Sequence, residues 1–396
     1  MVADSDVVIT GYGVFTAFGF GEQALLDGVF QGRHGFGPVR RFDTGRFRCD
    51  TAATYTGAGP GYPGMHAESF SPPRQRDVLV ACSSAAIAMS GLEPAKIGGA
   101  IVGSQGDYTP ITAFWRSGTE PEEPVADSLP SHLSHALADR LGLGPYRSTF
   151  VNACVASADA VIHAARLIRA GRVDALLCAG AYLVEEELFA KFDSARAFAK
   201  DGIVRPFAKD RTGLLLGDGV AGLVLESGRS ARARGAEVLA RVAGWGITSD
   251  AFHVSRPHPQ GRGTADAFRA ALRTAKLDAD RIDYVNVHGT GTASNDTAET
   301  AALHDVLGAR APKVAVSSTK STTGHPLEGA GAVEAVITLL ALRHGTVPPT
   351  ANFTTPDPAC DLDYVTDVPR EVGMDYAVSL NSAFGGVNTA IVLERR

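Results

Sequence analysis

The chain has few cysteines, and they are not paired in any motif. Its 396 residues include five cysteines, at positions 49, 82, 154, 178 and 360, with no CxxC. Disulfide frameworks and structural zinc sites need closely spaced cysteines, so neither is expected. A reducing compartment suits such a chain, and we expect a cytoplasmic protein.

Long apolar runs, a basic leader and strong charge are also missing. No run of about 18 or more uncharged apolar residues occurs, so no membrane span is predicted. The start, MVADSDVVITGYG, lacks a basic region before its apolar stretch and does not resemble a signal peptide. The formal net charge of −6 is mild and argues against nucleic acid or a membrane as a partner.

Motifs for metals and dinucleotides are incomplete. His253 and His258 have no carboxylate or thiol companions, so we predict no metal site and no bound cofactor. Gly11 and Gly13 begin a GxGxxG motif, but Thr16 stands where its third glycine should be. A dinucleotide-binding oxidoreductase is therefore disfavoured.

What the chain does contain is a repeat. Three kinds of segment occur in the same order in both halves: a strand with a glycine-broken turn, a helix leading to a strand, and a strand leading through a polar turn to a long apolar helix. The matching ranges are 6–19 with 237–250, 78–106 with 265–291, and 148–171 with 313–345. Three matches in register indicate a duplicated α/β unit.

The helical segments are rich in Ala and Val and poor in charge, which is typical of helices packed between sheets. We therefore expect an α/β fold with five α-β-α-β-α layers and two halves, 1–236 and 237–396. Residues 106–147 break the periodicity with Pro, Gly and acids, and we expect them to form a cap. Residues 184–216 are expected to be a second irregular insertion.

Cys154 occupies a junction between two patterns. The apolar strand TFVNA ends directly before it, and a helical pattern follows that stops at Gly171. Such a junction places the thiol at the positive end of a helix dipole, where its pKa should fall. Cys154 is thus a candidate nucleophile, although a lone cysteine among small apolar residues is more often part of a core.

Three further polar residues lie at equivalent turns. Lys320 and His325 follow the second-half counterpart of the strand before Cys154, and His288 ends the neighbouring strand. If the repeats are related by a pseudo-twofold axis, all four side chains meet in one pocket. Each has a structural alternative, but together they favour a catalytic site.

Three carboxylates near these turns are expected to be structural. Asp296 and Glu299 have the spacing of a helix capping box. Glu334 lies on an apolar helix and should pair with a basic residue, for which Lys320 is the candidate.

Four blocks resemble the signatures of the β-ketoacyl-ACP synthases, condensing enzymes of the thiolase superfamily. They are NACVASA, HGTGTASNDTAE, STKSTTGHPLEGAGAVEA and NSAFGGVNTA; RPFAKDRTGLLLGDGVAG is similar to the family's central block. The resemblance runs from end to end. It implies a thiolase-like fold and an elongating enzyme of fatty-acid or type II polyketide synthesis.

The resemblance also implies a mechanism. Cys154 would accept an acyl group from a carrier protein, and a malonyl thioester would lose CO₂ to give an enolate that attacks the acyl-cysteine. His288 and His325 would donate N–H groups to the enolate oxygen. Lys320 would set the electrostatics of the two histidines.

Further residues carry roles through the resemblance. The backbone amides of Cys154 and Phe384 would form an oxyanion hole, with Gly385 and Gly386 permitting the tight loop and Phe384 gating the acyl group. The substrate-binding positions are Thr290, Thr292 and Asn388, the threonines facing the pantetheine amides.

Four departures from the common pattern indicate a specialised member. NSAFGGVN is one residue shorter than usual, Val155-Ala156 follows the nucleophile where serines or small residues are usual, Asp218 stands in place of a glutamate, and Glu328 stands where a glycine is common. The Ala-rich composition, with more arginine than lysine, suits polyketide pathways, and type II polyketide synthesis is slightly preferred.

The expected partners are an acyl carrier protein, with Arg205 or Arg211 as candidate contacts, and a second ketosynthase-like subunit. That subunit is either identical or a chain-length factor. Alternative functions are a ketosynthase-like acyltransferase or cyclase, and a chain-length factor itself. The presence of Cys154 with both histidines disfavours the last.

Overall fold

The computed structural model describes residues 3–65, 73–119 and 125–396. In the described residues, the long strands form one 12-stranded sheet that bends where β1 (Val7–Thr16) meets β9 (Ala240–Ser249), and its two halves are called the first and the second sheet below. These two strands pair only at Val8 with Arg241 and at Ile9 with Ala240, so the junction is a corner rather than a full ladder.

The two sheets have matching topology. The first runs β6-β5-β7-β8-β1 and the second β11-β10-β15-β16-β9, with β13 added at the far edge and β2 paired with β1. In both sheets the first three strands are parallel and the last two antiparallel to their neighbours. The strands of the first sheet are β2 (Gly19–Phe20), β5 (Gly99–Gly103), β6 (Tyr146–Phe150), β7 (Ala175–Tyr182) and β8 (Gly219–Ser227). Those of the second are β10 (Tyr284–Asn286), β11 (Ala315–Ser317), β13 (Asp363–Tyr364), β15 (Tyr376–Ser382) and β16 (Val387–Arg395).

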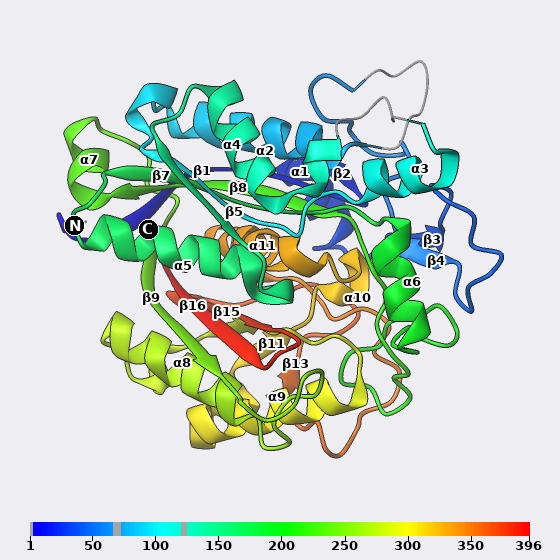
Figure 1. Ribbon diagram of the computed structural model, residues 1–396. Coiled ribbons are helices and arrows are strands. Elements are labelled where there is room, and N and C mark those ends of the chain that lie inside the picture. The colour runs from blue at the N-terminus through cyan, green and yellow to red at the C-terminus, as the bar shows by residue number, and fades with distance from the viewer. Residues whose placement is uncertain (1–2, 66–72, 120–124) are drawn as a thin grey trace.

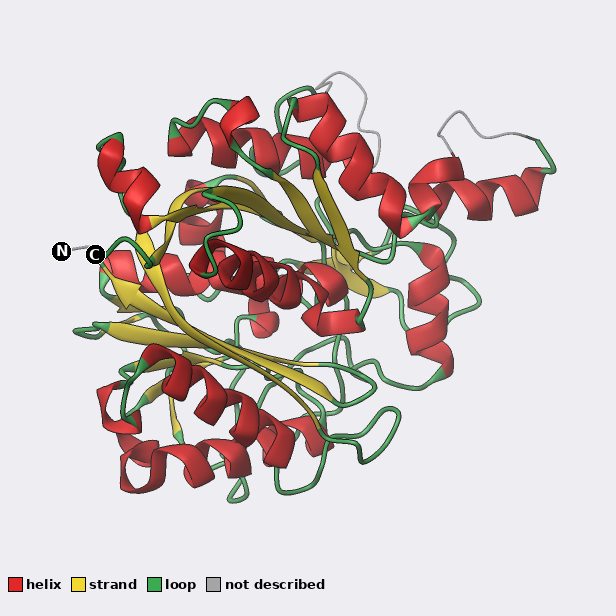
Figure 2. Ribbon diagram, turned by 60° about the vertical axis from the view of Figure 1, so that its left-hand side comes forward, coloured by secondary structure: helices red, strands yellow, loops and turns green. Residues whose placement is uncertain are grey.

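Helices complete five layers, as the sequence predicted. Figures 1 and 2 show helices between the two sheets and further helices outside each sheet. The central pair is α5 (Ala156–Arg169) and α11 (Ala330–His344); the outer pairs are α2 (Gln75–Ser90) with α4 (Pro130–Leu141), and α8 (Arg262–Ala275) with α9 (Ala293–Leu307).

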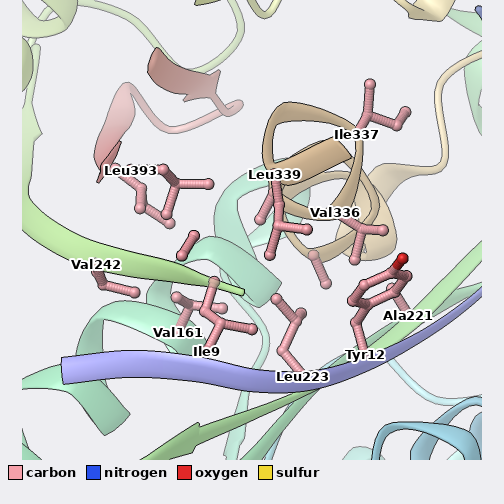
Figure 3. Close-up of a cluster of buried hydrophobic side chains, with 14 of the residues drawn as sticks. Ile9, Tyr12, Val161, Ala221, Leu223, Val242, Val336, Ile337, Leu339 and Leu393 are labelled. Atoms are coloured by element: carbon pink, nitrogen blue, oxygen red, sulfur yellow. The ribbon is translucent and has the colours of Figure 1, made fainter. Parts of the chain in front are cut away.

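The central layer is apolar because both of its faces are covered. Every residue of α11 from Ala330 to Leu342 is buried, which is what a helix without a polar face requires. Figure 3 shows side chains from α11 and α5 meeting those of strands from both sheets, among them Ile9 of β1 and Leu393 of β16.

Smaller elements surround this body. They are α1 (Glu22–Gly28), α3 (Thr109–Ser117), α6 (Glu186–Ser194), α7 (Gly228–Ala233), α10 (Lys320–Thr323), and the pairs β3 (Phe36–Pro38) with β4 (Thr51–Ala53) and β12 (Thr346–Val347) with β14 (Arg370–Glu371). Short 3₁₀ turns are η1 (Pro94–Lys96), η2 (Val125–Ser128), η3 (Ala153–Val155), η4 (Ala279–Arg281), η5 (Gly308–Lys313) and η6 (Leu327–Gly329). Within the described ranges no helix is both long and apolar enough to cross a bilayer.

Two expectations about insertions were too broad. Within 106–147, α4 is an integral outer-layer helix, because Leu133 and Leu137 pack into the core over β5. The amphipathic pattern of α4 is short and begins at a proline, so the loop-like composition of the surrounding residues concealed the helix in the sequence. Within 184–216, residues 186–194 form α6, and the remainder of that segment carries no regular helix.

Candidate active site

The turn that carries Cys154 is strained. After β6, Ala153 adopts a left-handed conformation with φ of 56°, and the chain then enters η3 and α5. A non-glycine residue in this region costs about 1–3 kcal/mol and persists only where the surroundings enforce it. The strained turn places Cys154 in η3, two residues before the first residue of α5.

Close packing of the central helices brings the two halves of the site together. A Cβ on Gly331 of α11 would lie 2.4 Å from the backbone nitrogen of Ala158 in α5. Because glycine leaves this space free, the helix starts touch, and η3 contacts η6. His325, two residues before η6, thereby reaches Cys154.

His325 is fixed through its backbone by the central sequence block. Its N–H donates to the Leu215 carbonyl at 2.7 Å, and its carbonyl accepts from Gly217 N–H at 3.1 Å. The imidazole Nε2 lies 3.1 Å from Cys154 Sγ. The His288 ring stands nearly perpendicular to that of His325, with 5.2 Å between centroids.

His288 is positioned by Glu299, which accepts the backbone N–H groups of His288 at 2.6 Å and Gly289 at 2.8 Å. The expected capping box of Asp296 and Glu299 is wrong, because α9 starts at Ala293 and both carboxylates lie inside the helix. Asp296 instead accepts the Phe207 N–H at 2.8 Å. Both side chains are structural, but they serve neighbouring loops rather than their own helix end.

Lys320 does not touch the cavity; it is buried with 1% exposure and forms an ion pair with Glu334. Glu334 also accepts from Asn381 Nδ2 at 2.5 Å. Sequence reasoning had not singled out Asn381, although it begins the NSAFGG block. This triad ties α10, α11 and β15 together directly behind the histidines.

The electrostatics keep both imidazoles neutral. Burial lowers the pKa of His288 and of His325 well below the usual value, and the positive charge of Lys320 lowers both further. Neutral rings with free nitrogen atoms are suited to donating hydrogen bonds to a developing negative charge.

The expected low pKa of the Cys154 thiol is wrong. Burial and, after it, the carboxylate of Glu328 raise the pKa of Cys154 to about 12, against the opposing charge of Lys320. Cys154 is only 6% exposed, and the loss of solvation on burial raises the thiol pKa by more than the positive end of the α5 helix dipole lowers it. The thiol therefore needs a proton acceptor, and His325 Nε2 is the adjacent one.

A cavity of about 280 Å³ opens onto Cys154. Its walls include both histidines, Thr290, Thr292, Asn388, Phe192 and Phe384. The Thr290 and Thr292 hydroxyls lie 2.9 Å apart at one side. Phe384 is half exposed, and its ring stacks on Phe192 with 5.9 Å between centroids.

The loop that carries Phe384 depends on two glycines. Gly385 and Gly386 have φ of 85° and 79°, a region that disfavours side chains. The Gly385 N–H donates to the Val254 carbonyl at 2.8 Å, whereas the Phe384 N–H has no acceptor among the described residues. That amide is available to a ligand.

Asn388 holds this loop rather than a substrate. Its amide nitrogen donates to Asp250 and to the Gly386 carbonyl, both at 3.0 Å, and its oxygen accepts from Ser382 and Thr264. All four hydrogen-bonding positions are occupied by protein, so the substrate-binding assignment is corrected to a positioning one.

The two arginines that were expected to contact the carrier protein differ in their exposure. Arg211 is buried against Asp296 and Asp357 and cannot meet a partner; that expectation is wrong. Arg205 is partly exposed but is paired with Asp201 and Asp210.

The departure at Asp218 has a structural role. This buried carboxylate accepts from Arg41 Nη1 at 2.7 Å and from the backbone amides of Tyr55 and Val184. Across the described part of the chain, no group of three or more His, Cys, Asp or Glu is arranged to hold a metal ion.

Comparison with known proteins agrees with this geometry. Residues 4–231 match the family model described as "Beta-ketoacyl synthase, N-terminal domain", and residues 239–354 match "Beta-ketoacyl synthase, C-terminal domain". The tetracenomycin polyketide synthase ketoacyl synthase alpha subunit of Streptomyces glaucescens is 35% identical over 99% of this chain and 98% of its own. The 3-oxoacyl-[acyl-carrier-protein] synthase 2 of Synechocystis sp. is 36% identical, with 98% of both chains covered.

Solved structures agree as well. The structure titled "The ishigamide ketosynthase/chain length factor" matches with a TM-score of 0.89 at 34% identity, covering all of both chains. A β-ketoacyl synthase from Burkholderia phymatum matches with a TM-score of 0.86 at 30% identity over 99% of both chains. Family models that span most of the chain, relatives that align along their whole length and a shared fold give one conclusion: this chain belongs to the β-ketoacyl synthase family.

Proposed function

We propose that the protein catalyses a decarboxylative Claisen condensation between an acyl group held on Cys154 and a malonyl group held on an acyl carrier protein. The observation that carries this proposal is the meeting of one thiol and two neutral imidazoles, from opposite halves of the chain, in a single cavity.

In the first half-reaction, His325 Nε2 accepts the proton of the Cys154 thiol. The sulfur attacks the thioester carbonyl of the incoming acyl carrier, and the carbonyl oxygen becomes negative. We assign the amides of Cys154 and Phe384 to receive that oxygen, because the Phe384 N–H has no acceptor among the described residues. The intermediate then expels the carrier's thiolate, which takes the proton back from His325.

In the second half-reaction, a malonyl thioester occupies the same cavity. Its carboxylate leaves as CO₂, and the electrons of the broken C–C bond move toward the thioester oxygen. N–H groups of His288 and His325 stabilise this enolate, with the ring proton of His325 moving from Nδ1 to Nε2 between the two half-reactions. The enolate carbon attacks the acyl-cysteine, and the Cys154 sulfur leaves as the β-ketoacyl product forms.

Lys320 acts at a distance in this scheme. Burial and, after it, the charge of Lys320 keep the histidines neutral, so they donate hydrogen bonds without delivering a proton to the carbanion. Glu334 and Asn381 hold Lys320 in place.

We place the reaction in type II polyketide synthesis, with carrier-bound substrates and a second ketosynthase-like subunit as partner. Supporting this, one relative is named as a polyketide synthase subunit, and one matching structure is titled as a type II polyketide synthase carrier protein in complex with its ketosynthase. The name of another relative specifies 3-oxoacyl-carrier-protein synthesis, so a specialised fatty-acid role is the competing assignment.

The test is intact-protein mass spectrometry after incubation with a panel of acyl- and malonyl-carrier proteins. The wild type should gain the mass of one acyl group and release a β-ketoacyl product when malonyl carrier is added. Cys154→Ala should show no adduct, whereas Cys49→Ala, which removes a half-buried cysteine elsewhere, should behave as wild type. An adduct on Cys154→Ala would reject the nucleophile. Acyl transfer that never consumes malonate would replace the condensation with an acyltransferase or cyclase.

A further inference from the structure

Glu328 is a buried acid to which the proposed reaction gives no task. It lies three residues after His325, in η6, and is 2% exposed. Because η6 packs against η3, this side chain belongs to the immediate surroundings of Cys154.

The carboxyl of Glu328 is held by a neutral group only. Its Oε1 accepts from Gln105 Nε2 at 2.6 Å, and no ion pair of Glu328 exists within residues 3–65, 73–119 and 125–396. Glu334, on the next helix, differs because it has both Lys320 and Asn381. A buried carboxyl without a cation holds its proton more tightly than a paired one.

The other titratable groups around Glu328 include one cation, Lys191, whose charge lowers the pKa of Glu328 but which forms no ion pair with it among the described residues. They are Cys154 on η3, Tyr182 on β7, Tyr108 before α3 and Lys191 on α6, with Glu185 beyond Tyr182. The Lys191 ammonium is already engaged by Glu187 at 2.7 Å and lies 5.4 Å from the centre of the Tyr108 ring.

These surroundings make the charge of Glu328 variable at neutral pH. Burial raises the pKa of Glu328 to about 7. Among the charged groups near the thiol, the carboxylate of Glu328 contributes most to the raised pKa of Cys154.

We propose that Glu328 is a positioning residue that sets the charge state of Cys154. A protonated Glu328 allows the Cys154 thiolate to form, whereas the negative charge of an ionised Glu328 disfavours that thiolate. Gln105 contributes to this balance, because its hydrogen bond favours the ionised carboxylate. The proposal rests on the proposed function only in taking Cys154 as the nucleophile.

The test is the rate of Cys154 alkylation by iodoacetamide from about pH 6 to 10, followed by intact mass. Glu328→Gln keeps the shape of the side chain and removes its charge. The pH dependence of the alkylation rate should shift to lower pH by about one unit in this variant. A more acidic thiol is also a weaker nucleophile, so the variant should react about threefold faster than wild type near pH 8. The thiol pKa lies above this range, so neither profile reaches its alkaline plateau, and the variant should stay faster than wild type from about pH 8 to 10.

Two further variants make the result specific. Gln105→Leu removes the donor that stabilises the Glu328 carboxylate, so it should shift the profile in the same direction. Glu93→Gln removes an exposed carboxylate elsewhere and should leave the profile unchanged. Cys154→Ala provides the background from the other cysteines.

Superimposable profiles for wild type and Glu328→Gln would overturn the proposal. If circular dichroism shows that Glu328→Gln does not fold, the Gln105→Leu variant provides the test instead. An unshifted alkylation profile in that variant rejects the proposal, and a shift to lower pH supports it. If Glu328→Gln shifts the alkylation profile but the wild type catalyses no condensation, the proposed function is rejected and this inference stands. Condensation without a shift would defeat this inference alone.

Discussion

The Nε2 atom of His325 lies 3.1 Å from the Sγ atom of Cys154, although 171 positions separate the two residues. Each residue stands at the equivalent turn of its half, after β6 and after β11 respectively. The contact thus joins the two halves of a duplicated fold at a single pair of atoms.

This contact predicts unequal effects of the two histidines. His288→Ala should reduce condensation by about 10²–10³-fold, because a donor to the enolate oxygen is lost, while acyl loading remains near wild type. His325→Ala should reduce both steps, since the thiol also loses its proton acceptor. Single-turnover loading and malonyl decarboxylation, measured separately, check this. His135→Ala, at an exposed site, is the control. Equal loading in the two active-site variants would contradict the role of His325 as a base.

The ion pair between Lys320 and Glu334 predicts that substitutions of the two residues have non-additive effects on the free energy of unfolding. Lys320→Met leaves a buried carboxylate without its cation and should lower the free energy of unfolding by about 3–5 kcal/mol. Glu334→Leu should cost a similar amount, and the double variant should recover much of the loss. Denaturant unfolding measures all three. Additive losses would show that the pair does not interact as the structure places it.

The low pKa values of the histidines predict the pH dependence of decarboxylation. A lowered pKa means that the neutral ring persists to lower pH, so the rate should stay level from about pH 8 to below the usual histidine value of about 6.5. In a folded Lys320→Met variant the acid limb should move upward by about one unit, because a like charge is removed. Initial rates across this range, with circular dichroism as a check on folding, provide the measurement. An acid limb near pH 6.5 in the wild type would contradict neutral, shielded rings.

The glycines of the Phe384 loop predict a graded effect. Gly385→Ala and Gly386→Ala both force a side chain into a left-handed conformation, at a cost of about 1 kcal/mol or more. At Gly386 the new Cβ would also lie 3.0 Å from Asp250 Cβ, while nothing lies within 4 Å at Gly385. Gly386→Ala should therefore reduce kcat/KM for the acyl carrier more strongly. Equal reductions would show that only the backbone conformation matters.

The layers of the fold followed directly from the sequence. Strand and helix patterns that recur in the same order predict two similar sheets, and helices without a polar face predict a central layer. The helix α4 was missed because its apolar buried face consists of Leu133, Leu137 and Ala138 alone, and because its first residue is Pro130. Short amphipathic helices in polar surroundings carry too little pattern to be distinguished from a loop.

The members of the site could be named from the sequence, whereas their electrostatics could not. Spacing and block order single out Cys154, His288, Lys320 and His325, because chemistry demands those residue types at those turns. The pKa of Cys154 depends on how completely the sulfur is buried and on Glu328, which reaches it from another turn. The occupied amide of Asn388 likewise depends on side chains from three other segments. Local patterns determine which elements form and which groups are present; solvation and Coulomb energy depend on distances between segments remote in the chain, and only the packed structure decides those.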